Sequence, residues 1–153
     1  MSNTLAHFQH QMQALGPSVE WIDALIQEDE QSWSVSTVQG LAIGISYIKQ
    51  PARLILSACM GQPEEAERES VYTTMLCSNL LCADQASLRV ALTGPEGELL
   101  LISEFTPNEW TLAEITDAIL DFSATTKNFI EVIEISVDDM IGTFQHTNPS
   151  VRV

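Results

Sequence analysis

The chain has few basic residues. Of its 153 residues only 6 are Lys or Arg, against 21 Asp or Glu, and the formal net charge is −15 at pH 7. Affinity for nucleic-acid backbones and for anionic membrane surfaces comes mainly from Lys and Arg. The charge therefore argues against nucleic acid and membrane as partners. It serves solubility, and a basic protein segment is the partner that it favours.

Long apolar runs and a disulfide framework are also lacking. No stretch approaches the ~20 apolar residues that a membrane span requires. The first residues, MSNTLAHFQHQMQALGP, have neither the basic start nor the continuous apolar core of a secretory signal. Three cysteines are an odd number for a set of disulfides. Reduced thiols in a cytoplasmic protein are the simplest interpretation.

No group of residues has the pattern of a reactive site. Cys77 and Cys82 are separated by about 140° on a helix, and the three histidines lie elsewhere in the sequence. We expect Cys59, Cys77 and Cys82 to be small buried hydrophobic residues rather than metal or redox ligands. The acidic run EEAERE fits a solvated helix start better than an acid–base site. The sequence therefore predicts no catalytic residue, no metal site and no cofactor.

The apolar spacing indicates a single domain of mixed secondary structure. Leu5, Phe8, Met12 and Leu15 recur at the intervals of a helix face. Three runs with a period of two follow, at residues 33–37, 41–47 and 53–60, and predict strands. Between the first helix and the first of these strands, residues 19–26 have the spacing of a short helix, and a solvated loop follows them.

A second helix, two further strands and a last helix complete the expected order. The helix opens after Gly61-Gln62-Pro63, the strands flank the turn at residues 94–97, and TLAE at 111–114 is a capping box that starts the last helix. The order α-β-β-β-α-β-β-α predicts an α+β fold, with helices packed on an antiparallel sheet. We expect a domain at residues 1–135 and a C-terminal tail at 136–153.

The second helix, ESVYTTMLCSNLLC, has an apolar arc wider than one sheet requires. A helix packed against a sheet needs a stripe of only about 100°, and here two adjacent stripes are apolar. Other parts of the same domain could cover the second stripe, or a second copy could meet it across a twofold axis. Periodicity alone leaves both alternatives open.

The whole pattern resembles the class I type III secretion chaperones, the Tir chaperone family. The resemblance covers residues 3–133 and includes the amphipathic first helix, the helix ESVYTTMLCSNLLC, the hairpin SLRVALTGPEGELLLISEF and the helix TLAEITDAILDF. It implies a non-enzymatic bacterial cytoplasmic homodimer that binds the N-terminal region of a secreted effector and keeps it soluble and ready for export. The alternative is a regulatory module that binds a folded partner or a small ligand.

The resemblance also suggests which residues form each contact. The dimer interface is expected to involve the second helix, at Val71, Tyr72, Met75, Leu76, Asn79 and Leu80. An extended effector segment can add a strand to an open sheet edge and place alternate side chains in apolar pockets. The residues expected to form those pockets are Leu5, Phe8, Met12, Trp33, Val35, Ile43 and Ile45.

Overall fold

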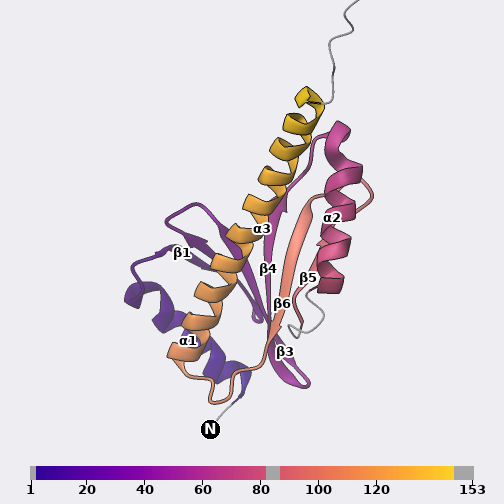
Figure 1. Cartoon of the computed structure of the whole chain (residues 1–153). Coiled ribbons are helices and arrows are strands. Elements are labelled where there is room, and N and C mark those ends of the chain that lie inside the picture. Colours follow the sequence, from indigo (N-terminus) through magenta and orange to yellow (C-terminus); the bar gives the residue numbers. More distant parts are fainter. Residues whose placement is uncertain (1–2, 82–86, 147–153) are drawn as a thin grey trace, which may run out of the picture.

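The protein is an antiparallel sheet with its α-helices packed on one face (Figure 1). The computed structural model describes residues 3–81 and 87–146, with side chains described as far as Glu134. The expected α+β class is confirmed, with one strand more than the sequence predicted. In chain order the described elements are α1 (Leu5–Ser18), β1 (Ile22–Gln27), β2 (Ser32–Thr37), β3 (Ala42–Lys49), β4 (Ala52–Gly61), the short 3₁₀ helix η1 (Glu65–Glu67), α2 (Arg68–Leu81), β5 (Arg89–Leu92), β6 (Leu99–Phe105) and α3 (Leu112–His146).

The additional strand is β1, and the short helix suggested by the apolar spacing there is wrong. Ile22–Gln27 pairs antiparallel with β2, and Leu25 lies opposite Val35. A tight turn reverses the chain between the two strands, where the backbone N–H of Gln31 donates to Oδ1 of Asp29 at 2.7 Å. An Asp side chain that bonds the backbone two residues further on stabilises such a turn. The run EDEQ therefore closes a hairpin.

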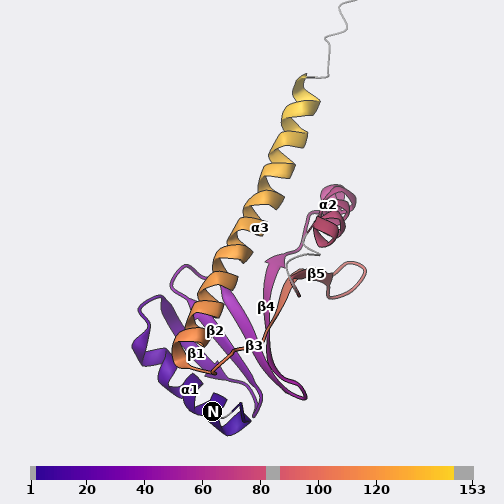
Figure 2. The same ribbon diagram turned by 60° about the horizontal axis from the view of Figure 1, so that its bottom comes forward.

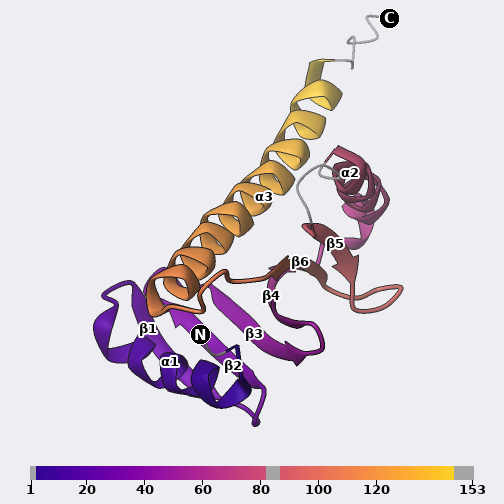
Figure 3. The same ribbon diagram turned by 90° about the horizontal axis from the view of Figure 1, so that it is seen from below.

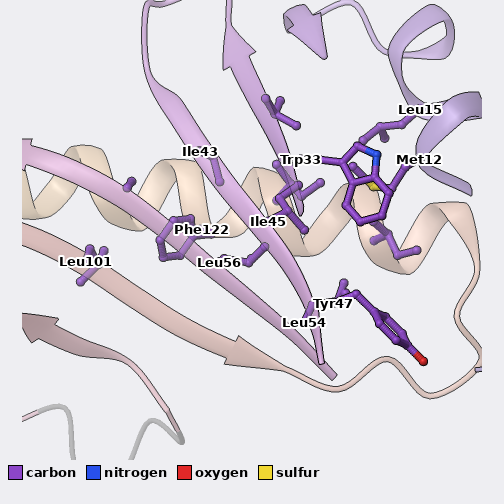
Figure 4. Packing of buried hydrophobic residues seen from close by; sticks show 14 of the residues in the cluster. Met12, Leu15, Trp33, Ile43, Ile45, Tyr47, Leu54, Leu56, Leu101 and Phe122 are labelled. Carbon is purple, nitrogen blue, oxygen red and sulfur yellow. The ribbon is translucent and has the colours of Figure 1, made fainter. Parts of the chain in front are cut away.

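The six strands lie in the order β1-β2-β3-β4-β6-β5, so β1 and β5 are the two edges. Strand residues alternate between a buried face and a partly exposed face, as the period of two predicted. Figure 4 shows the packing of the buried face. Its strand residues include Trp33, Val35, Ile43, Ile45, Tyr47, Leu54, Leu56, Ala58 and Leu101.

Each helix covers a different part of the buried face. α1 contacts β1 and β3, α3 contacts β4 and β6, and α2 contacts β5. α1 also contacts α3, and the two lie side by side at the β1 end of the sheet (Figure 3). Because α2 lies at the opposite end, over the edge strand β5, one of its sides is left uncovered by the sheet.

Four aromatic rings fix α1 on the sheet. The Phe8 ring lies edge-on to Trp33, with ring centres 4.9 Å apart, and stacks on Tyr47 at 5.7 Å. It also meets the ring of Trp110 edge-on at 6.1 Å. Trp110 precedes α3, has a φ of 56° and is buried, which the sequence did not predict. Each such pair contributes ~0.5–1.5 kcal/mol beyond the area it buries, so this cluster stabilises the α1–α3 end of the core.

The opposite face of the sheet carries small residues at its centre. Ser34 pairs with Gly44, and Gly44 pairs with Ser57 across three neighbouring strands. Ser36 and Ser46 lie on the same face, and all these residues are partly exposed. A Cβ atom placed on Gly44 would lie 2.8 Å from the Ser57 hydroxyl oxygen. A side chain at Gly44 would therefore require the Ser57 hydroxyl to move.

The expected capping box at the start of α3 is confirmed. The backbone N–H of Glu114 donates to the Thr111 hydroxyl at 3.2 Å, and Oε2 of Glu114 accepts from the Thr111 N–H at 3.3 Å. The Glu114 carboxylate also accepts from the N–H groups of Asn108 and Glu109. Desolvation raises the pKa of Glu114, but hydrogen bonds from these N–H groups lower it by more, so the pKa lies below its ordinary value. The ionised form therefore holds the loop before α3.

Replacing Thr111 with alanine is expected to lower the free energy of unfolding by about 1 kcal/mol, because an N-cap hydroxyl is lost. Chemical denaturation monitored by circular dichroism measures this difference. Thr73→Ala is the matched control, since its hydroxyl bonds a carbonyl within the exposed part of α2. The control should change stability by less than about 0.5 kcal/mol. Equal losses in the two variants would contradict the capping role.

α3 continues far beyond the sheet that it covers (Figure 2). It has 35 residues, a length of about 52 Å at 1.5 Å per residue. The helix runs to His146 and so includes much of the region expected to be a tail from residue 136. No helix in the described part of the chain has both the length and the apolar character for crossing a membrane.

Candidate binding surfaces

Most residues expected to form effector pockets lie in the core. Phe8, Met12, Trp33, Val35, Ile43 and Ile45 are all buried between α1 and the sheet. Leu5 differs, because it is partly exposed and lines a pocket of about 610 Å³ with residues of β3 and of the turn after β1. The spacing correctly showed which side chains share a face. It did not show that their own helix and sheet enclose them.

The six α2 residues expected in a dimer interface fall into two groups. Val71 and Met75 are buried in the chain's own core. Tyr72 and Asn79 are partly exposed and make internal hydrogen bonds: the Tyr72 hydroxyl donates to the Gly97 carbonyl at 3.3 Å, and Asn79 exchanges two hydrogen bonds with the backbone of Val90. These four therefore hold α2 against the β5–β6 hairpin.

The remaining two belong to an exposed apolar surface on α2. The exposed fractions are 68% for Leu76, 79% for Leu80 and 82% for Leu81. We call Leu76 and Leu80, which lie one helical turn apart, the α2 leucine face; Leu81 lies about 140° around the helix from Leu76. Leu92 of β5 is exposed beside this face, and Leu76 and Leu92 share an almost wholly apolar pocket of about 180 Å³. Exposed leucines grouped in this way are typical of a surface that contacts another protein.

A second apolar groove separates α2 from α3. Its volume is about 200 Å³, and it is lined by Ser78 and Leu81 of α2 together with Asn128, Phe129 and Val132 of α3. No pattern in the sequence assigned Leu81, Phe129 or Val132 to a site, although Leu81 widens the apolar arc of its helix.

The outer edge of the sheet at β1 has a different character. Ile26 is 59% exposed there. The strand and the turn after it also carry four exposed carboxylate residues, Asp23 on the strand and Glu28, Asp29 and Glu30 in the turn. Among the described strands only β1 and β5 have an edge without a strand partner. β1 therefore combines unpaired backbone groups, an exposed apolar side chain and negative charge.

The cysteines are not the buried residues that the sequence predicted. Cys59 and Cys77 are exposed, the first at the bulged end of β4 and the second on the uncovered side of α2, while Cys82 lies outside the described residues. The Cys59 thiol donates to a carboxylate oxygen of Glu98 at 3.3 Å. Desolvation raises the pKa of Cys59, and the nearby Glu98 carboxylate raises it as well. The hydrogen bond from the Gly61 N–H lowers it by less, so Cys59 stays a thiol. A protonated thiol is a poor nucleophile and a poor metal ligand.

The described residues offer no constellation for metal binding. No group of three or more His, Cys, Asp or Glu side chains within them is placed to hold an ion. His7, a partly exposed residue of α1, bonds instead to the Trp110 carbonyl, with Nε2 at 2.9 Å from the oxygen. What this part of the chain provides is a set of surfaces: the α2 leucine face, the α2–α3 groove and the β1 edge.

Comparison with known proteins agrees with a binding role. Residues 26–133 match the model of the Tir chaperone protein (CesT) family. Among solved structures, a chain in the structure of the HopA1-SchA chaperone-effector complex matches with a TM-score of 0.61 and 12% identity, over 86% of this chain and 98% of that one. No curated protein matches the sequence. The structural match supports the fold, and the family match spans β2 to the middle of α3.

Proposed function

The chain belongs to the Tir chaperone protein (CesT) family, and on that premise we propose that it is a dimeric type III secretion chaperone. In this proposal it binds the N-terminal segment of an effector in the bacterial cytoplasm and keeps that segment soluble and competent for export. The observation that carries the proposal is the family match over residues 26–133, which includes five of the six strands and all of α2.

The α2 leucine face is the proposed centre of the dimer. Leu76 and Leu80 are one helical turn apart and are exposed, whereas Val71 and Met75 on the other side of α2 are buried in the same chain. Exposed leucines lose unfavourable contact with water when a second copy covers them. A twofold axis beside α2 would bring the same face of both copies together, as most soluble dimers do.

The β1 edge is the proposed docking site for the effector segment. Strand addition satisfies backbone groups that an edge strand leaves unpaired, and side-chain contacts then select the partner. β5, the other edge, lies under α2 and beside the proposed dimer face. The β1 edge lies at the far end of the sheet, so a dimer can hold an effector segment without the two contacts competing.

The charge of this edge favours a basic segment. Asp23, Glu28, Asp29 and Glu30 are exposed around β1, in a chain of net charge −15. Complementary charges raise the rate of association and disfavour acidic competitors. Apolar contacts such as Ile26 must still offset the entropy lost when a disordered segment becomes ordered. The segment expected here is therefore extended, basic, and apolar at alternate positions.

The proposal is tested by isolating the chain from its host and mapping what remains bound. A tagged wild-type chain should retain one or few secreted proteins, and deletion of their N-terminal segments should abolish retention. Ile26→Glu should weaken binding at least tenfold, because a carboxylate would replace an apolar contact at an already acidic edge. A tenfold change corresponds to about 1.4 kcal/mol. Isothermal titration calorimetry with the isolated N-terminal segment measures it.

Leu120→Glu is the matched control, since Leu120 is 45% exposed and belongs to α3, which packs on β4 and β6. It should bind the segment as the wild type does. Equal weakening in both variants would contradict docking at β1. Retention of partners through folded C-terminal domains would contradict the chaperone function itself.

A further inference from the structure

Helix α2 lies beside β5, the strand that forms one edge of the sheet (Figure 1). Asn79 bonds the backbone of this strand twice: its Nδ2 donates to the Val90 carbonyl at 3.1 Å, and its Oδ1 accepts from the Val90 N–H at 2.6 Å. Nearer the start of α2, the Tyr72 hydroxyl donates to the Gly97 carbonyl at 3.3 Å. These contacts fix α2 to the β5–β6 hairpin at two separate points.

The register of the hairpin shows which backbone groups of β5 point away from β6. The Thr93 N–H donates to the Glu98 carbonyl at 3.1 Å, so these two residues form a hydrogen-bonded pair. In antiparallel strands, pairs that exchange hydrogen bonds alternate with pairs that do not. Counted back from Thr93, Leu92 and Val90 fall on pairs that do not, and their N–H and C=O groups point outward. A strand added at β5 would bond to these two residues.

The Asn79 side chain occupies one of these two bonding positions. A side-chain amide carries the same N–H donor and C=O acceptor as a peptide group. Asn79 therefore takes both outward groups of Val90, as the backbone of a neighbouring strand would. Of the two residues, Leu92 alone is left to pair with an incoming strand, and a ladder needs bonds at successive positions along both strands. Strand addition at β5 is blocked as long as Asn79 stays in place.

The surroundings of β5 show why this edge needs such a block. Leu92 is 41% exposed and shares with Leu76 the almost wholly apolar pocket of about 180 Å³. An open strand edge beside apolar side chains is prone to aggregation, and proteins protect such edges with charged residues or with a covering element. β1 has the charged residues, and β5 has the covering helix. Asn79 is the group through which that helix reaches the edge itself.

The β1 edge has no equivalent of Asn79 in the described part of the chain. The side-chain hydrogen bond nearest to it serves the following turn, where Gln27 donates to the Asp29 carbonyl at 3.0 Å. The Glu28 N–H donates to the Ser32 carbonyl at 2.9 Å. By the same alternation, Gln27 and Leu25 then turn their backbone groups away from β2. No described side chain bonds to these groups, so β1 is open where β5 is closed.

We propose that Asn79 closes the β5 edge and thereby confines an extended segment to the β1 edge. The inference rests on the effector docking in the proposed function and deepens it, because it names the residue that selects between the two edges. Asn79 acts through Val90 and does not touch the segment, so it is a positioning residue. Each chain then holds one segment, although its sheet has two edges.

The test compares two substitutions that each remove contacts between α2 and the hairpin. Asn79→Ala removes both bonds to Val90. Tyr72→Phe is the matched control, because it removes the bond to Gly97 and frees no group of the β5 edge. Asn79→Asp, which replaces the donor to the Val90 carbonyl with a carboxylate oxygen, is the second opening variant. Circular dichroism verifies that the variants are folded.

The probe is a short synthetic peptide of alternating Lys and Val residues, and NMR measures the hydrogen exchange of single amides with and without it. In the wild type and in Tyr72→Phe, the peptide should slow exchange at the outward N–H groups of β1 by about tenfold or more, and it should leave Leu92 unchanged. In Asn79→Ala it should also slow exchange at Val90 and Leu92. Asn79→Asp should act in the same direction.

The outcomes separate this inference from the proposed function. If neither Asn79 variant gains protection at Val90 and Leu92, closure by Asn79 is overturned, and docking at β1 stands wherever that edge still gains protection. If the Asn79 variants gain protection at β5 while β1 gains none, docking at β1 is overturned and the closure stands. Protection of Leu92 in the wild type, or equal protection in Tyr72→Phe, would also overturn the role of Asn79.

Discussion

Leu80→Glu is expected to convert the dimer into monomers, with a dissociation constant raised at least 100-fold, or about 2.8 kcal/mol. Leu80 is 79% exposed, so the single chain tolerates the substitution. Across a twofold axis the change acts twice, and each new carboxylate must lose water against apolar side chains and a like charge. Light scattering over a range of concentrations measures the mass. A Leu80→Glu chain that keeps the wild-type dimer mass would refute the α2 interface.

Met75→Glu serves as the contrasting substitution on the same helix. Met75 is buried within its own subunit, so a carboxylate there would unfold the chain instead of separating two folded copies. Loss of the circular dichroism signal with Met75→Glu, and its retention with Leu80→Glu, would distinguish the two sides of α2.

Cys77 offers an independent measure of the same contact. It is exposed on α2, between Leu76 and Leu80 in the sequence, and residues close to a twofold axis meet their own counterparts. With Cys59 and Cys82 replaced by serine, a short bifunctional thiol reagent should therefore link two wild-type subunits at Cys77. The Leu80→Glu substitution should abolish that link.

Phe8→Ala is expected to lower the free energy of unfolding by about 3–5 kcal/mol, the range for removal of a buried phenyl ring. Phe8 is fully buried and contacts the rings of Trp33, Tyr47 and Trp110. Such a loss is a large fraction of the ~5–15 kcal/mol that stabilises a typical domain. Urea unfolding monitored by tryptophan fluorescence measures it.

The matched control for Phe8 is His10→Ala, an exposed position on the same helix. It should change stability by less than about 0.5 kcal/mol. Unchanged stability of Phe8→Ala, together with loss of effector binding, would show that the ring serves a partner instead of the core. The result thus decides between the two roles that the sequence alone left to this residue.

The fold was predictable where local pattern and tertiary packing agree. The alternation in β2 and β3 matches the buried face, and the capping box at Thr111 marks the start of α3. β1 was missed because its adjacent Leu25 and Ile26 break the alternation, whereas β2, also of six residues, alternates throughout. Pairing with β2 then decides its conformation, and a single segment does not contain that information.

The candidate site was less predictable. Apolar spacing shows that a face of a helix or strand is buried, but it does not show whether the same chain or a partner covers that face. The same helical stripe contains Phe8, whose ring is enclosed by its own chain, and the sequence offered no means to separate it from a docking residue. On α2 the unusual width of the apolar arc was informative. It indicated that more than one side of the helix is apolar, and the structure separates an inner side, where Met75 is buried, from an outer side, where Leu80 is exposed.

The serines on the outer face of the sheet affect how readily copies of the chain would associate through that face. Its hydroxyls at Ser34, Ser46 and Ser57 are partly exposed, and burying them unpaired under another sheet would cost free energy. A methyl group on Gly44 would lie 2.8 Å from the Ser57 hydroxyl oxygen, so a larger residue there requires Ser57 to change its side-chain conformation. Because Ile55 lies opposite Ser46 and Ile102 opposite Ser57, polar groups separate the apolar residues of this face, and two such faces gain less free energy by stacking than two wholly apolar faces would.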